Sequence, residues 1–142
     1  TVTTKMSAFT AMEADVPVAG VATLEGATVT FKNGQLTNHS GVTGAALTAI
    51  LPTAYSNVVL SAENGATDKK LMGAEAGKGT GTWVNNFYDT KGGTVTVPPS
   101  SQDIDAVDSS IELAIPGTAK KSKDYTYVST ITWTVSSTPD SI

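Results

Sequence analysis

The chain has 142 residues, enough for one hydrophobic core, and we expect residues 1–142 to form a single domain. Its net charge is −4, and its nine basic residues are all lysine, so it lacks the arginine forks that bind phosphates and base edges. The longest apolar runs fall well short of the roughly 18 residues that a membrane span needs. These features argue against nucleic acid as a partner and against direct membrane insertion.

The composition favours short strands over amphipathic helices. Hydrophobic residues make up 39% of the chain and charged residues only 15%, while threonine, serine, glycine, valine and alanine dominate. Such a mixture suits strands joined by turns, and a helical spacing of apolar residues is nowhere sustained. The sequence therefore predicts an all-β fold.

Alternating apolar residues mark the expected strands along the chain. These segments are Ala27 to Phe31, Leu47 to Leu51, Val58 to Leu60, Val95 to Val97, Ile111 to Ile115 and Tyr125 to Val135. Glycine, asparagine and proline turns separate them, as at Asn33-Gly34 and Pro116-Gly117. Seven or more short strands at this spacing are typical of a two-sheet antiparallel β-sandwich with immunoglobulin-like architecture.

Two further segments lack this alternation. Ala66 to Ala76 contains helix formers sufficient for one helical turn, although Gly73 and Gly77 interrupt it. Ser100 to Ser109 is bounded by prolines and polar residues, and we expect it to form a long loop or an excursion at a sheet edge.

The C-terminal segment has one apolar face and one threonine face, because side chains alternate along a strand. The apolar face consists of Tyr127, Ile131, Trp133 and Val135. It is either buried in the core or exposed as a stripe that docks a protein. We expect Trp133 to be buried, within one core that contains Val29, Phe31, Leu113, Ile115, Ile131 and Val135.

The second tryptophan, Trp83, is the better candidate for the surface. It follows the glycine-rich turn Gly77 to Gly81 and precedes Asn85, Asn86, Phe87 and Tyr88. That composition suits stacking on a sugar or contact with a partner strand. The candidate binding residues are therefore Trp83, Phe87, Tyr88, Tyr127, Ile131, Trp133 and Val135.

Groups for catalysis or metal binding are sparse. His39 is the only histidine and lies in an expected loop, cysteine is absent, and there is no Gly-x-Ser-x-Gly nucleophile motif. Asp103 to Asp108 is acidic, but it lacks the glycine and distal glutamate of a calcium loop, so a solvated loop is favoured. Lys120, Lys121 and Lys123 are expected to keep another loop solvated. We expect no catalytic residue, metal or cofactor.

The spacing Tyr127-x-x-x-Ile131-x-Trp133-x-Val135-x-x-x-Pro139 resembles the C-terminal signature of WxL domains. Ile111 to Gly117, followed by a lysine-containing turn and the C-terminal strand, resembles the closing hairpin of this family. Gly79 to Trp83 and Leu24 to Ala27 also match in order and spacing. The chain departs from the family at Trp133-Thr134-Val135, where valine replaces leucine, and Trp83 is followed by Val84-Asn85.

The resemblance implies a non-catalytic, secreted module that retains a protein or complex on the Gram-positive cell wall. Retention would act through peptidoglycan, through a WxL-interacting partner protein, or through both, and it predicts a monomer. A pilin-like or capsid-decorating subunit is an alternative, which predicts self-assembly through an edge strand. A carbohydrate-binding module that uses Trp83 and Tyr88 is another.

Overall fold

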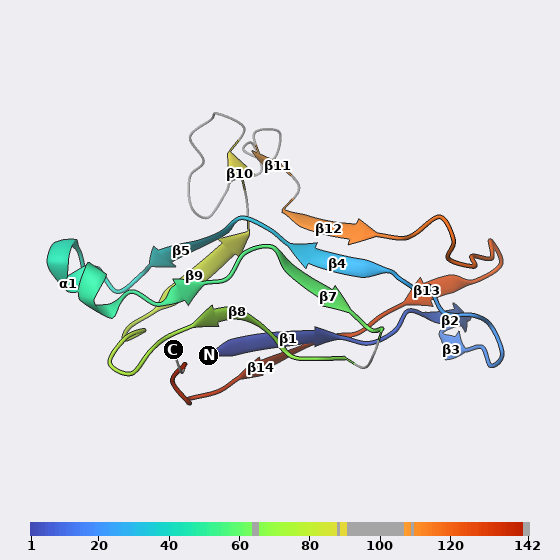
Figure 1. The fold of residues 1–142 in the computed structure, drawn as a ribbon, viewed down its shortest axis with the longest axis horizontal. Coiled ribbons are helices and arrows are strands. Elements are labelled where there is room, and N and C mark those ends of the chain that lie inside the picture. Colours follow the sequence, from blue (N-terminus) through green and yellow to red (C-terminus); the bar gives the residue numbers. More distant parts are fainter. Residues whose placement is uncertain (64–65, 88, 91–106, 109, 141–142) are drawn as a thin grey trace.

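The structure, a computed structural model, describes residues 1–63, 66–87, 89–90, 107–108 and 110–140 (Figure 1). The described residues form fourteen strands and one short helix, which confirms the all-β class. The elements are β1 (Val2–Met6), β2 (Thr10–Glu13), β3 (Val16–Pro17), β4 (Thr28–Phe31), β5 (Gly34–Asn38), α1 (Gly44–Ile50), β6 (Thr53–Ala54), β7 (Val58–Ser61), β8 (Lys69–Gly73), β9 (Trp83–Phe87), β10 (Asp89–Thr90), β11 (Val107–Asp108), β12 (Ile111–Ala114), β13 (Thr126–Val128) and β14 (Ile131–Val135).

The described strands pair only antiparallel, in sheets ordered β14-β1-β8-β6, β12-β4-β7, β13-β2-β3, β5-β9 and β10-β11. The sheet of β12, β4 and β7 lies above β8, β1 and β14 in Figure 1, and β7 contacts both β1 and β8. The described strands thus divide among five hydrogen-bonded sheets. The two-sheet immunoglobulin-like sandwich stays a prediction.

The core lies where β4 and β7 pack against β1 and β8. Its buried members are Met6, Val29, Phe31, Leu60 and Leu71, with Phe9, Val58, Phe87 and Ile131 packed against them. Alternation explains the choice of residues, because Val29 and Phe31 share one face of β4 while Thr28 and Thr30 share the other. The predicted burial of Val29 and Phe31 is confirmed.

Three other predicted core residues are exposed instead. Leu113 is 52% exposed, Ile115 37% and Val135 81%. Leu113 and Val135 belong to β12 and β14, which are edge strands among the described residues and pair there only with β4 and β1 respectively. Ile115 follows β12. Leu113 and Val135 face the core side of their sheets, but no described strand lies beside them on the outer edge to shield them from solvent. The prediction of a shared core was wrong for these three.

The C-terminal segment does not form one continuous strand. It divides into β13, which pairs with β2, and β14, which pairs with β1. Ser7 holds the chain at the break, since its N–H donates to Thr130 O at 2.9 Å and its Oγ accepts from Thr130 N at 2.9 Å. The predicted closing hairpin was also wrong, because β12 pairs with β4 rather than with the C-terminal strands.

Two local predictions were wrong. Leu47 to Leu51, predicted as a strand, lies largely in α1, because Gly44-Ala45-Ala46-Leu47 is rich in alanine, the best helix former. Ala66 to Ala76 contains β8 rather than a helical turn, because pairing with β1 and β6 buries Leu71. The predicted strand Val95 to Val97 lies outside the described residues. Most of Ser100 to Ser109 also lies outside the described residues. Within it, Val107 and Asp108 are described and form β11.

Candidate functional site

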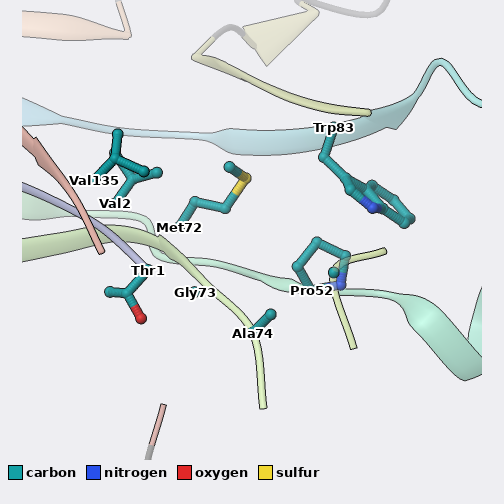
Figure 2. Close-up of a pocket in the computed structure, with 9 residues that line it drawn as sticks. Thr1, Val2, Pro52, Met72, Gly73, Ala74, Trp83 and Val135 are labelled. Atoms are coloured by element: carbon teal, nitrogen blue, oxygen red, sulfur yellow. The ribbon is translucent and has the colours of Figure 1, made fainter. Parts of the chain in front are cut away.

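Two adjoining apolar hollows lie over one end of the four-stranded sheet, and both include Val2 and Met72. The Trp83 hollow has a volume of about 200 Å³ and is shown in Figure 2; its lining residues are Thr1, Val2, Pro52, Met72, Gly73, Ala74, Gly79, Trp83 and Val135. The Trp133 hollow has a volume of about 350 Å³; its lining residues are Val2, Phe31, Leu71, Met72, Asn85, Phe87, Ile111 and Trp133. The two tryptophans, distant in the sequence, therefore line neighbouring hollows.

Trp83 is held at the start of β9 by backbone pairing and by its own indole. It pairs with Asn38 of β5, and its Nε1–H donates to Thr80 O at 3.0 Å. Figure 2 shows the ring beside Pro52, with Met72 between this pair and Val135. Because the indole N–H already has a partner, the Trp83 ring offers mainly apolar surface to the hollow.

Trp133 rests on the core but is not buried within it. Its side chain is 53% exposed, so the predicted burial was wrong. The ring meets Phe31 edge-on, with centroids 5.8 Å apart and planes at 81°, and Phe31 also contacts Phe87 at 5.2 Å. The cause is again the edge position of β14, where one side of the ring packs on Phe31 and the other faces solvent.

The structure brings four of the candidate binding residues to the two hollows: Trp83, Phe87, Trp133 and Val135. Ile131 packs partly buried against the core. Tyr127 lies on β13 in a different sheet, where its hydroxyl accepts a hydrogen bond from Ser122 N at 3.1 Å. Tyr88 lies outside the described residues. The candidate set is thus divided between the hollows, the core and a separate sheet.

Sequence reasoning missed Val2, Pro52 and Met72 as lining residues. Val2, Thr4 and Met6 alternate along β1 in the same way as the strands that were recognised. That alternation could have identified Val2. Met72 and Pro52 reach the site only through the pairing of β8 with β1 and β6, for which the sequence offers no local signal.

A polar cluster centred on Asp140 lies beside Thr1 and Gly73, two residues that line the Trp83 hollow. Asp140 accepts hydrogen bonds from Thr1 Oγ1 at 2.8 Å and Tyr55 Oη at 3.0 Å, and it pairs with Lys70 Nζ at 2.8 Å. These partners, Lys70 first, stabilise the charged form and lower the pKa of Asp140 to about 2, against the opposing effect of burial. The same contacts join the two ends of the described chain, so we call them the terminal clasp.

Acid is expected to weaken the fold through the terminal clasp. The pKa of Asp140 is about 2 in the folded chain against a reference value of 3.8, so its contribution to stability is fully present above about pH 4. That contribution is lost as the pH falls through 2. Asp140→Asn should therefore lower the Tm at pH 7, and the difference from wild type should shrink towards pH 2.

Thermal melts followed by circular dichroism at pH 7, 4 and 2 would measure this difference. Asp68→Asn, at an exposed position before β8, is the matched control and should melt like the wild type throughout. If the Tm of Asp140→Asn stays below that of the wild type by the same amount down to pH 2, the lowered pKa of Asp140 would be contradicted.

The described residues contain little that suggests other chemistry. His39 is exposed, and they hold no cluster of three or more His, Cys, Asp or Glu side chains suited to a metal ion. Asp103 and Asp105 of the acidic segment lie outside the described part of the chain. Lys120, Lys121 and Lys123 are all exposed, as a solvated loop requires. The described helix is too short to cross a membrane.

Comparison with known proteins assigns the chain to a family. The family model for the WxL domain, described as surface cell wall-binding, matches residues 1–139. Searches of curated proteins and of solved structures returned no match. Because the family model spans nearly the whole chain, the chain belongs to the WxL domain family of surface domains that bind the cell wall.

Proposed function

We propose that this domain is a secreted, non-catalytic module that retains a protein or complex on the Gram-positive cell wall. The family match supports the wall as its location. The main structural support is the placement of Trp83 and Trp133 at two hollows that share Val2 and Met72. Tryptophan beside a preformed apolar hollow is a common anchor in protein recognition.

We further propose that the direct ligand is a WxL-interacting protein, with peptidoglycan as the alternative. The exposed side chains around the hollows are apolar: Ile111 is 57% exposed, Trp133 53% and Val135 81%. Contiguous exposed apolar surface is typical of sites that bind protein. A sugar ligand would need several polar groups aimed into the site, whereas among the described residues Asn85 is the only amide side chain that lines either hollow.

Replacing either tryptophan should weaken retention. We expect Trp83→Ala and Trp133→Ala each to reduce affinity for native walls by about tenfold or more, as for anchor residues at interfaces. Val84→Ala is the matched control, because Val84 follows Trp83 on β9 and is exposed but lines neither hollow. Pull-down on purified walls, after thermal melts have shown that each variant is folded, gives the measurement. Wild-type affinity in both folded tryptophan variants would contradict the site.

A second arm separates the two ligands. Walls boiled in detergent lose their non-covalently held proteins but keep peptidoglycan. If a partner protein is the ligand, binding should disappear on boiled walls and return when the co-expressed WxL-interacting protein is added. Undiminished binding to boiled walls would assign peptidoglycan instead.

A further inference from the structure

The outer edge of β14 presents unpaired backbone groups. Thr1 and Ser136 exchange two backbone hydrogen bonds, each of 2.9 Å, and Ser7 N–H donates to Thr130 O. Hydrogen-bonded and non-hydrogen-bonded pairs alternate along an antiparallel ladder. The backbone groups of Thr132 and Thr134 therefore face β1. Those of Ile131, Trp133 and Val135 point away from it, and none of the described residues bonds to them.

Nothing in β14 protects this edge. Natural edge strands are usually blocked by lysine, proline or a bulge. The sequence Ile-Thr-Trp-Thr-Val contains no charge and no proline, and its pairing with β1 is regular over all five residues. In Figure 1, β14 lies along the lower border of the molecule. No described strand pairs with this edge, which is therefore available to a strand of another chain.

The strand is also self-complementary. If two copies of β14 run antiparallel and are centred on Trp133, then Trp133 faces Trp133, Ile131 faces Val135, and threonine faces threonine. Apolar and β-branched pairs of this kind stabilise neighbouring strands. The strand is neutral, so this pairing opposes no like charges. Of the possible partners, a second copy of this chain fits the alternation at every position.

We propose that two copies of this chain associate through their β14 edges about a two-fold axis. The four-stranded sheet then continues into that of the second copy. On its core-facing side, Met6 and Ile131 of one copy align with Val135 and Val2 of the other, as the β1–β14 register requires. The pairing places Val135 beside Ile131 of the second copy and the two Trp133 rings side by side. The two-fold pair is a closed dimer, unlike the open-ended assembly expected of a structural subunit. This proposal replaces the expectation of a monomer.

A cysteine at the centre of the strand tests the register. The chain has no cysteine of its own, so a single introduced cysteine forms only intermolecular disulfides. In the proposed pair, the two Cα atoms at position 133 lie about 5.5 Å apart, within disulfide reach. Under mild oxidation at low protein concentration, Trp133→Cys should form a dimer that non-reducing electrophoresis resolves.

Val135→Cys is the matched control. Position 135 is more exposed than position 133, yet its two copies are four residues out of register, about 14 Å apart, in the proposed pair. Random collision predicts more crosslinking at 135, and two-fold pairing predicts more at 133. Equal or greater yield at 135 overturns the proposal.

Sedimentation equilibrium tests the association without a cysteine. Val135→Pro removes an outward-facing N–H while leaving the bonds to β1 intact, and proline is tolerated at such positions of edge strands. We expect it to weaken dimerisation at least tenfold, whereas Val135→Thr, which keeps the N–H, should stay within about threefold of wild type. A wild-type chain that remains monomeric up to about 1 mM, where a millimolar dimer would be well populated, overturns the proposal.

The outcome is separable from that of wall retention. A monomeric chain that still binds walls rejects the β14 pairing and leaves the proposed function in place. A dimer that fails to bind walls or the WxL-interacting protein supports the β14 pairing and rejects the proposed function.

Discussion

Phe31→Ala is expected to lower the free energy of unfolding by about 3–5 kcal/mol, the usual cost of truncating a buried phenylalanine. The Phe31 side chain is only 3% exposed, and its ring contacts both Phe87 and Trp133. It also forms part of the wall of the Trp133 hollow, so its loss would enlarge that hollow and remove the support of the tryptophan. Urea unfolding followed by far-UV circular dichroism gives the measurement.

Leu113→Ala is the informative control for that substitution. Leu113 pairs with Val29 on the same face of the sheet as Phe31, but it lies on the edge strand β12 and is 52% exposed. We expect it to cost less than about 1 kcal/mol. If both variants lost the same stability, the edge position of β12 would be contradicted.

Gly73→Ala is expected to destabilise the domain by about 1–3 kcal/mol, as overpacking of a filled site generally does. A Cβ atom at Gly73 would collide with the carboxylate of Asp140, whose side chain is only 10% exposed. Either β8 shifts, or the carboxylate leaves Lys70, Thr1 and Tyr55. Thermal and urea unfolding would detect either change.

A double-mutant cycle identifies the cause. In Asp140→Ala, the collision partner is absent, so adding Gly73→Ala should cost little more. Gly117→Ala is the matched control, because a Cβ atom there meets nothing within 4 Å. Full additivity of Gly73→Ala and Asp140→Ala would show that the glycine is needed for a reason other than the terminal clasp.

The sequence allowed the strands and their apolar faces to be predicted, but not which strands lie at sheet edges. Val29 and Leu113 have equivalent spacing in their strands, and they even pair with each other, yet one is buried and the other exposed. The difference arises from β7, which covers the other side of β4 but does not reach β12. Edge position depends on this order of strands, which is a non-local property.

The same limit applies to the candidate site. Trp83 and Trp133 were recognised from their neighbours in the sequence, and both line hollows. The burial of Trp133 was predicted wrongly, because an apolar strand face indicates the direction in which its side chains point but not whether other residues cover them. Met72 joins the site because β8 pairs with β1. This pairing places Met72 opposite Val2, although the two residues are 70 positions apart in the sequence.

The arrangement of β1 and β14 determines how the domain responds to a pulling force. The two strands are antiparallel, and Thr1 and Ser136 lie opposite each other at one end of their ladder. A force applied between these two ends would peel the ladder open one pair at a time, instead of shearing all its hydrogen bonds together. The terminal clasp at Asp140 would be the first contact to break. The fold is therefore better suited to bearing a load between one end and a bound partner than between its two ends.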